Sequence, residues 1–265
     1  MKAQDSGGAY MDFSVIVPAF NEERRIAACL ESIRAQRTRH SYEVIVSDSN
    51  STDRTASIAA SYADKLADRT ASIAASYADK LVVCRERGTA RARNEGARLA
   101  CGDILAFIDS DTVIMPDYLD TVYETFRDKR TLAVSCAFKF TNRRPKLLAA
   151  EYATNAYYIL RSLCGAATLP GFNVCIRRGA FERVGGFRLC HLEDLDMSIK
   201  LRQIGKTVYL SRRLAVTSSR RLEQDGIAGT LKYYMDLFEA SQNRRLGFHV
   251  IKLKRSQYND YVHRE

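Results

Sequence analysis

The chain has 265 residues, of which 46% are hydrophobic, and a formal net charge of +10 at pH 7. This length allows one sizeable α/β domain, and seven scattered cysteines without a Cys-x-x-Cys pair argue against a disulfide framework and a zinc site. No apolar run approaches the roughly 18–20 residues that cross a bilayer, so we expect a cytoplasmic protein. The basic charge favours anionic partners: phosphorylated small molecules, an anionic membrane surface or nucleic acid.

The first half of the chain alternates between predicted strands and helices. A run of β-branched and apolar residues at 13–17 predicts a buried strand. Asn-Glu-Glu at 21–23 predicts a helix start, because asparagine caps helices and carboxylates suit the positive end of the helix dipole. Further elements follow in order: strands at 42–46, 81–84 and 104–108, and a helix at 89–100. This alternation predicts right-handed βαβ units and a mostly parallel sheet.

Residues 53–67 and 68–81 repeat one sequence with a period of 15. Removing either copy leaves a strand–helix–strand unit of ordinary length, so the repeat indicates an insertion and not a solenoid. A continuous helix through both copies would rotate the second apolar face by roughly 60° from the first. We therefore predict that one copy packs on the sheet and the other is extruded, with Asp53 and Asp68 as competing N-caps. Both copies carry the same apolar face, so the sequence leaves open which one packs.

The second half of the chain holds longer predicted elements. They are helices at 116–127, 145–163, 193–204 and 227–240, and strands at 132–140, 172–177 and 207–210. The helix at 145–163 is amphipathic and rich in Tyr and Leu, which is consistent with core packing, a homodimer interface or peripheral contact with a membrane surface. The tail from 241 is basic and aromatic.

Acidic residues follow two of the predicted strands. Asp109 and Asp111 come directly after the strand at 104–108, and Asp48 follows the strand at 42–46. Ligands bind beyond the carboxyl ends of parallel strands, so we expect these residues to converge with the turn at Asn21. Two carboxylates separated by one residue can hold Mg²⁺ or Mn²⁺ on a diphosphate, while helix capping is the structural alternative. For Asp48 the alternative is an Asx turn.

Two further charged groups are candidates for a site. Arg93 lies in the first turns of a predicted helix, where the dipole disfavours a cation, so we expect a phosphate or carboxylate partner. Glu193 and Asp194 begin another predicted helix after the Gly-Gly-Phe turn at 185–187. Capping explains acidic residues at this position, and a general base that takes a proton from an attacking hydroxyl is the functional alternative.

Seven motifs in chain order resemble glycosyltransferase family 2, the inverting enzymes of the GT-A fold. They are Val-Ile-Val-Pro-Ala-Phe-Asn-Glu at 15–22, Val-Ile-Val-Ser-Asp-Ser-Asn-Ser-Thr-Asp at 44–53, Gly-x4-Arg-Asn-x-Gly at 88–96, Ile-Asp-Ser-Asp at 108–111, Gly-Phe-Asn-x3-Arg-Arg at 171–178, Gly-Gly-Phe at 185–187 and Glu-Asp-x-Asp at 193–196. The resemblance implies a Rossmann-like, mostly parallel central sheet flanked by helices, with a smaller acceptor-side subregion and a C-terminal helical tail. It implies one catalytic domain at 13–222, with a nucleotide-sugar half at 13–111 and an acceptor half at 112–222, followed by a basic helical tail at 223–265.

The resemblance also implies roles for individual residues. The donor-binding set is Pro18, Asn21, Glu22, Asp48, Arg93, Asp109 and Asn173. Asp111 and Asp109 would hold Mn²⁺ or Mg²⁺, while Asp194 would be the catalytic base with Glu193 beside it. Arg220 and Arg221 stand where many relatives place a metal-binding histidine, and they would instead clamp the diphosphate or a phosphate on the acceptor.

The implied reaction is inverting sugar transfer from a nucleoside-diphosphate sugar to an acceptor hydroxyl or a lipid phosphate, by metal-assisted direct displacement. The expected partners are the nucleotide-sugar donor and a saccharide or lipid-linked acceptor. One alternative is a nucleotidyltransferase acting on a sugar phosphate, but no Gly-rich phosphate loop follows the first strand. The other is a basic nucleic-acid-binding protein, but clustered stacking aromatics are absent from the sequence. Ser49 stands where the family often has a second aspartate, which leaves the donor base open.

Overall fold

The computed structural model describes residues 11–67, 80–190, 192–220, 222–224, 226 and 229. The elements are, in chain order, β1 (Met11–Ala19), α1 (Ile26–Arg34), β2 (Tyr42–Asp48), α2 (Thr55–Ala67), β3 (Lys80–Val83), α3 (Thr89–Leu99), β4 (Gly102–Ile108), β5 (Val113–Ile114), α4 (Tyr118–Phe126), β6 (Thr131–Phe140), α5 (Pro145–Leu163), β7 (Asn173–Arg177), α6 (Arg178–Arg183), α7 (Glu193–Ile204) and β8 (Lys206–Thr217).

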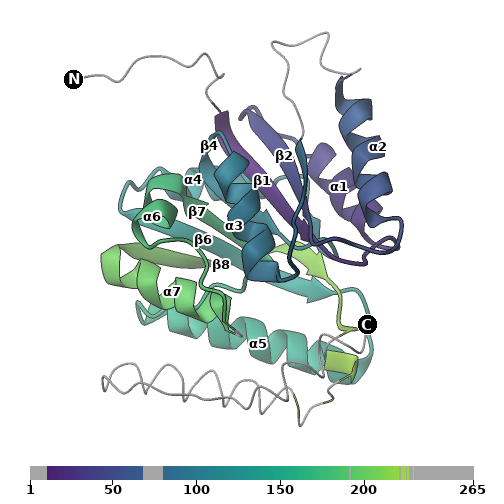
Figure 1. Cartoon of the computed structure of the whole chain (residues 1–265). Coiled ribbons are helices and arrows are strands. Elements are labelled where there is room, and N and C mark those ends of the chain that lie inside the picture. The colour runs from purple at the N-terminus through teal and green to yellow at the C-terminus, as the bar shows by residue number, and fades with distance from the viewer. Residues whose placement is uncertain are drawn as a thin grey trace, which may run out of the picture.

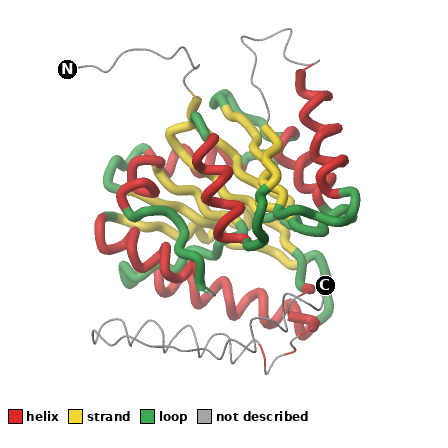
Figure 2. Tube along the Cα trace, in the orientation of Figure 1, coloured by secondary structure: helices red, strands yellow, loops and turns green. Residues whose placement is uncertain are grey.

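One sheet organises the described part of the chain, and helices cover both of its faces (Figures 1 and 2). Its strands are ordered β3-β2-β1-β4-β7-β6-β8-β5. The half formed by β3, β2, β1 and β4 is entirely parallel, whereas β7 runs antiparallel to both of its neighbours. The α/β class and the mostly parallel sheet flanked by helices, both expected from the sequence, are therefore confirmed.

The strands are buried on both faces because they separate two apolar layers. Phe13, Val15 and Val17 of β1 pack with residues of α1, α2, α4 and α5, while Ile16 packs with residues of α3, α6 and α7. This two-sided burial explains why the sequence of β1 is a continuous apolar run and not an alternating one. Among the described helices, none has the length and apolar character that crossing a membrane requires.

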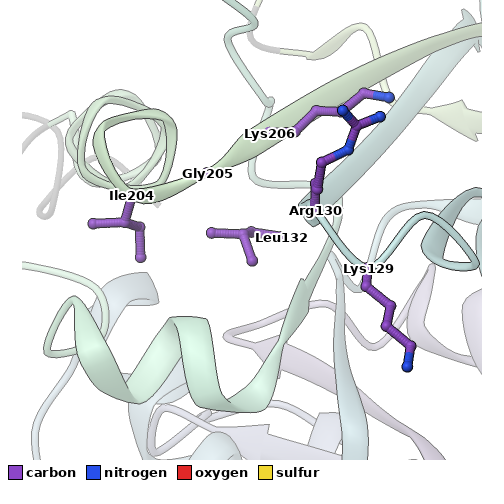
Figure 3. Close-up of a pocket in the computed structure, with 6 residues that line it drawn as sticks. All are labelled: Lys129, Arg130, Leu132, Ile204, Gly205 and Lys206. Atoms are coloured by element: carbon purple, nitrogen blue, oxygen red, sulfur yellow. The ribbon is translucent and has the colours of Figure 1, made fainter.

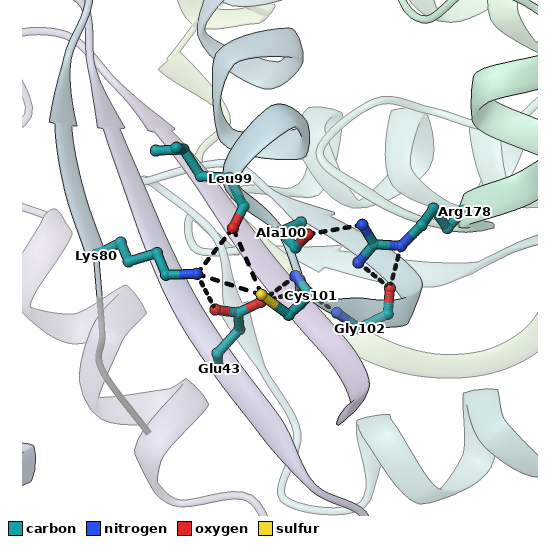
Figure 4. A network of polar contacts seen from close by, with 8 residues as sticks. Glu43, Lys80, Leu99, Ala100, Cys101, Gly102 and Arg178 are labelled. Carbon is teal, nitrogen blue, oxygen red and sulfur yellow. Dashed lines mark hydrogen bonds and ion pairs between the residues drawn. The ribbon is translucent and has the colours of Figure 1, made fainter. Parts of the chain in front are cut away.

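The edge of the sheet where the parallel strands begin is closed by a polar network (Figure 4). Glu43, only 2% exposed, accepts a hydrogen bond from Ser14 Oγ at 2.6 Å and pairs with Lys80 Nζ at 3.0 Å. Arg178 of α6 donates to the carbonyl oxygens of Ala100 and Gly102 at 2.6 and 2.8 Å. These contacts fix the starts of β1 to β4 against one another, and they lie at the edge opposite to the strand ends.

Two predicted boundaries differ from the structure by more than two residues, each for a physical reason. The first helix begins at Ile26 and not at 21–23, because Asn21 adopts a φ of 50° and its side chain accepts a hydrogen bond from the Thr52 N–H. The strand predicted at 207–210 extends to Thr217 as β8. Its pairing with β6 shifts register between Leu210 and Arg213, and this irregularity interrupts the alternation that the prediction followed.

Several elements fell outside the predictions or lie beyond the described residues. The two-residue strand β5 and the short helix α6 were not predicted. Both are too short to show a periodic pattern of their own. The predicted helix at 227–240 and the basic tail from 241 lie outside the described residues, apart from Gly229.

The first copy of the repeat forms α2. Its Ile58 and Tyr62 pack against the core, and Asp53 accepts a hydrogen bond from the Thr55 N–H at 2.9 Å at the start of the helix. The second copy ends in Lys80 and Leu81, which begin β3, while its residues 68–79, including the competing cap Asp68, lie outside the described residues. The two copies therefore contribute different elements, a helix and the start of a strand.

Deleting residues 53–67 is expected to preserve the fold. The product has the same sequence as a chain lacking residues 65–79, so it keeps one helix copy and the Lys80 strand start. Loop-closure entropy changes only slowly with length, so we expect the thermal midpoint to stay within about 4 °C of the parent value. Circular dichroism during heating measures this, and a broad, non-cooperative transition in the deletion variant would contradict the packing of the first copy.

Candidate active site

The carboxyl ends of three neighbouring parallel strands meet at one edge of the sheet. β1 ends beside β2, with Ala19 opposite Asp48, and β4 lies on the other side of β1 and runs into Asp109. α3 packs so closely over these strands that a Cβ on Gly96 would lie 2.4 Å from Ile16 Cγ2. Because ligands of such sheets bind beyond the carboxyl ends of the strands, this edge is the candidate site.

Two loops at this edge are joined by side-chain hydrogen bonds. Asp48 is 1% exposed, and its carboxylate accepts hydrogen bonds from the Ser51 N–H at 2.9 Å and from Ser51 Oγ at 2.5 Å. Ser51 Oγ in turn accepts a hydrogen bond from the Asn21 N–H at 3.0 Å. Asp48 thus bonds the N–H three residues on, a local side-chain turn related to the expected Asx turn but one residue longer, and it also places Asn21 at the end of β1. A contact between Asp48 and a nucleotide base stays a prediction.

Glu22 is the centre of a cluster that connects distant parts of the chain. It is 7% exposed, and its two carboxylate oxygens accept hydrogen bonds from Arg25 at 3.0 Å and from Arg220 at 2.7 Å. Arg220 follows β8, so this pair joins the end of the last strand to the loop after the first. Arg220 thus lies at the strand ends beside Glu22, whereas Arg221 lies outside the described residues.

Arg93 joins the strand edge to the start of α7. Its side chain is 3% exposed and donates hydrogen bonds to Asp109 Oδ1 at 2.8 Å and to Glu193 Oε1 at 3.1 Å. Gly171 lies against it, and a Cβ there would be 2.8 Å from both terminal guanidinium nitrogens. Burial alone would lower the pKa of Arg93, but the Asp109 and Glu193 carboxylates raise it overall. The carboxylate partner expected from the sequence is thus confirmed, and there are two of them.

Asn94 holds the turn that precedes α7. Its side-chain amide donates to the Phe187 carbonyl at 2.8 Å and accepts from the Phe187 N–H at 2.9 Å. Gly186 has a φ of +71°, and a Cβ there would lie 2.8 Å from Asn94 Oδ1. Sequence reasoning missed this positioning role, although the place of Asn94 directly after Arg93 in the Gly-x4-Arg-Asn-x-Gly motif was a signal for it.

Glu193 and Asp194 have different surroundings. Burial raises the pKa of Glu193 to about 7, against the lowering effect of Arg93 and with a further rise caused by Asp194. Asp194 lies in the first turn of α7, where its Oδ1 accepts a hydrogen bond from the Leu195 N–H at 2.8 Å. Its main-chain carbonyl accepts from Ser198 Oγ at 2.7 Å. Glu193 is thus held by the buried arginine, while the Asp194 carboxylate is fixed locally within the helix.

Asp111 lies in an acidic environment. Burial raises its pKa to about 6, and the neighbouring Asp109 and Glu22 raise it further against the opposing effects of Arg220 and Arg25. Among the described residues, no group of three or more His, Cys, Asp and Glu side chains is arranged to hold a metal.

Two members of the predicted donor-binding set lie inside the fold. Asn173 is fully buried in β7, and its amide bonds to the main chain of Cys136 in β6 at 3.1 and 3.2 Å. It also accepts a hydrogen bond from Ser135 Oγ. Pro18 is buried near the end of β1. The Asn173 side chain thus joins β6 to β7, so contact with a ligand here would come from the neighbouring backbone, as at Gly171.

A hollow elsewhere on the molecule does not belong to this edge (Figure 3). It is lined by Lys129, Arg130, Leu132, Ile204, Gly205 and Lys206. β6 runs parallel to β4 through the intervening antiparallel β7, so this hollow lies where the strands begin, away from Asp109. Arg130 and Lys206 both pair with Asp128 there, at 3.1 and 3.0 Å.

Replacing Asp111 with asparagine is expected to stabilise the metal-free chain at pH 8. The folded-state pKa of Asp111 is raised from 3.8 to about 6, so its contribution to stability is present at low pH and is lost as the pH rises through about 6. The gain in the free energy of unfolding should be about 1–3 kcal/mol at pH 8 and should shrink towards pH 4. Urea unfolding in EDTA at both pH values tests this, and an equal difference at both would contradict it.

Sequence comparisons identify relatives over most of the chain. Residues 14–185 match the family model described as Glycosyl transferase family 2. The putative glycosyltransferase EpsH of Bacillus subtilis is 35% identical over 121 residues, which cover 46% of this chain and 32% of that protein. A PGL/p-HBAD biosynthesis glycosyltransferase of Mycobacterium bovis is 27% identical over 254 residues, covering 90% of this chain and 88% of that protein.

A comparison of structures agrees with the fold expected from the sequence. The mannosyltransferase PcManGT from Pyrobaculum calidifontis, whose structure contains GDP-Man and Mn²⁺, superposes with a TM-score of 0.64 and 27% sequence identity. The match covers 79% of this chain and 57% of that one. The GT-A architecture is thereby confirmed for the described part of this chain.

Proposed function

This chain belongs to glycosyl transferase family 2, and on that premise we propose that it transfers a sugar from a nucleotide-sugar donor to an acceptor by direct displacement. The observation that carries this proposal is the bridge from Asp109 through Arg93 to Glu193. It brings the acidic strand edge, where a donor would bind, beside the start of α7, where a base would act. The two ends of the bridge are 84 positions apart in sequence, from 109 to 193.

The donor is proposed to bind over the ends of β1, β2 and β4. Its nucleoside would lie beside Pro18, Asn21, Glu22 and Asp48, in agreement with the general position of ligands on parallel sheets. The similar mannosyltransferase binds GDP-Man. Ser49, which stands where the family often has a second aspartate, is buried next to Asp48. The donor screen described below tests which base this chain prefers.

Asp111 and Asp109 are proposed to hold Mn²⁺ or Mg²⁺ together with the diphosphate of the donor. Their fit to such a cation rests on the repulsion between the two carboxylates, since Asp109 raises the pKa of Asp111 and a bound cation would relieve this effect. Carboxylate oxygens are the ligands that these hard cations prefer. When bound, the cation would neutralise charge that develops on the departing diphosphate.

Asp194 is proposed to take the proton from the acceptor hydroxyl. The acceptor oxygen then forms a bond to the anomeric carbon as the bond from that carbon to the phosphate oxygen breaks, and the nucleoside diphosphate leaves with the electron pair. A single displacement of this kind inverts the configuration at the anomeric carbon. Glu193 is proposed to bind acceptor or sugar from its place beside the base.

The arginines after β8 are proposed to bind phosphate groups. Arg220 pairs with Glu22 at 2.7 Å, and its positive charge lowers the pKa of Asp111. Its guanidinium would form charge-assisted hydrogen bonds with the diphosphate or with a phosphate on the acceptor. Arg221 is given the same role from its sequence position alone. A saccharide or a lipid-linked acceptor both agree with the net charge of +10, which also favours peripheral contact with an anionic membrane surface.

Thermal unfolding with a panel of uridine, guanosine and thymidine diphosphate sugars, with and without Mn²⁺, tests the proposal. We expect at least one donor to raise the thermal midpoint by several degrees in the presence of Mn²⁺, because ligands that bind only the folded state stabilise it. The Asp111→Ala variant should lose the Mn²⁺-dependent part of this rise. No stabilisation by any donor, or unchanged Mn²⁺ dependence in the variant, would contradict the assignment of the site.

A further inference from the structure

One buried carboxylate holds two arginines that come from distant parts of the chain. Glu22 accepts hydrogen bonds from Arg25 at its Oε2 and from Arg220 at its Oε1. The Glu22 side chain is 9% exposed, whereas the side chains of Arg25 and Arg220 are 37% and 34% exposed. The carboxylate is therefore enclosed, while both arginine side chains remain accessible to a ligand at the donor edge.

The backbone that carries each arginine is fixed to the same edge of the sheet. The Arg25 N–H donates a hydrogen bond to the Glu22 carbonyl at 2.9 Å, which ties the start of α1 to the loop after β1. On the other side, Thr112 Oγ1 donates to Thr217 Oγ1 at 3.0 Å. This bond joins the end of β8, three residues before Arg220, to the acidic turn after β4. The two arginines thus have separate supports beside one turn.

The position of Arg25 is unfavourable for a cation. Arg25 is the N-cap residue of α1, and the first turn of this helix contains no acidic residue. The N-terminal end of a helix dipole is positive, so it favours anions and disfavours cations. Glu22 offsets the charge of Arg25, but the same carboxylate also pairs with Arg220. Two arginines and a helix N-terminus therefore meet at a single carboxylate.

Asp111 is a second acid on which both arginines act. The charges of Arg220 and Arg25 lower its pKa, against the stronger effects that raise it. If Asp111 holds a cation, as proposed above, the two arginines are left with Glu22 as their shared carboxylate. Guanidinium groups form strong, often bidentate hydrogen bonds with phosphate oxygens. A diphosphate is therefore the ligand whose charge and shape complement this pair of arginines.

We propose that Arg25 binds the diphosphate of the donor opposite Arg220, and that Glu22 holds the two guanidinium groups as the sides of one clamp. This inference rests on the proposed function and adds a residue to it, since Arg25 lies outside the seven motifs that resemble the family. The clamp attracts phosphate through side chains of the protein alone. Part of the affinity for a nucleoside diphosphate is therefore independent of a metal and remains in EDTA.

The test compares Arg25→Met with Arg24→Met in the full chain, by calorimetric titration in EDTA with UDP, GDP, UMP and GMP. Arg24 is exposed and directly precedes Arg25, so the two variants make the same change in net charge. Arg25→Met should weaken binding of the preferred diphosphate about 10-fold, as expected for one lost charge-assisted hydrogen bond, and should weaken binding of the monophosphate by a smaller factor. Arg24→Met should change either affinity less than about twofold.

Two further measurements separate phosphate binding from a structural ion pair. Arg25→Lys keeps the charge but not the planar fork, so its diphosphate affinity should lie between those of the parent and Arg25→Met. Without nucleotide, Arg25→Met should unfold within about 3 °C of the parent, because Glu22 keeps Arg220 as a partner.

Several results would overturn the inference while leaving the donor site intact. They are equal losses in Arg25→Met and Arg24→Met, equal losses for monophosphate and diphosphate, or an unchanged diphosphate affinity in Arg25→Met. A parent chain that binds none of the four nucleotides, even with Mn²⁺ in place of EDTA, would instead contradict the proposed function, and the clamp would fall with it.

Discussion

The Asp194→Asn variant is expected to lose sugar transfer while it keeps its affinity for the donor. Asparagine has nearly the same shape as aspartate but cannot take a proton from the acceptor hydroxyl, and a positioned general base contributes about 10²–10⁴-fold to a rate. We therefore expect kcat to fall by about that factor. The nucleotide would bind over the strand ends, so the shift in thermal midpoint caused by donor and Mn²⁺ should be unchanged. Steady-state kinetics and thermal unfolding measure the two quantities separately.

Asp196 provides a control for this prediction on the same helix. It is 3% exposed and pairs with Lys200 Nζ at 2.9 Å, so we expect its side chain to stabilise α7. Asp196→Asn should lower the thermal midpoint but change kcat much less than Asp194→Asn does. If Asp194→Asn instead weakened donor binding and left kcat unchanged, the assignment of Asp194 as the base would be wrong.

The donor edge of the fold could be predicted because its signals are local. Asp48, Asp109 and the strands that precede them are adjacent in sequence, and the rule that ligands bind at the ends of parallel strands then brings them together. The exact limits of the helix at 145–163 and of the helix at 193–204 were also predicted, because Pro145 begins one and acidic residues begin the other.

The contacts between distant segments could not be predicted in the same way. The family resemblance implied that Arg93 and Arg220 belong to the site, but no spacing in the sequence shows that Arg93 lies between Asp109 and Glu193, or that Arg220 pairs with Glu22. For Asn173 the sequence motif suggested a role that its side chain does not have in the structure. Its place in a motif suggested a ligand contact, whereas its amide joins two strands, because a buried polar group must find partners wherever the fold puts it.

Replacing Arg93 with methionine is expected to give the largest loss of stability in the candidate site. The substitution keeps much of the apolar volume but leaves Asp109 and Glu193 without their shared cation. Breaking a buried pair by removing one partner costs about 3–5 kcal/mol. We expect about 3 kcal/mol, the lower end, because the side chains of Asp109 and Glu193 remain 31% and 19% exposed. Arg93→Lys should lose less, since it keeps the charge but cannot present a planar fork to two carboxylates.

The pH dependence of the Arg93→Met variant distinguishes lost charge pairing from lost packing. Glu193 has a pKa of about 7 in the presence of Arg93, and removal of the arginine takes away the effect that lowers it. Below that pKa the folded variant binds a proton at Glu193 and avoids a buried charge, so its stability should be closer to the parent at pH 5.5 than at pH 8. Glu193→Gln should remove most of this dependence, because glutamine does not titrate. If urea unfolding gives the same loss in the free energy of unfolding at both pH values, Arg93 acts through packing against Gly171 and Phe187. The bridge between the donor edge and the base would then have no electrostatic role.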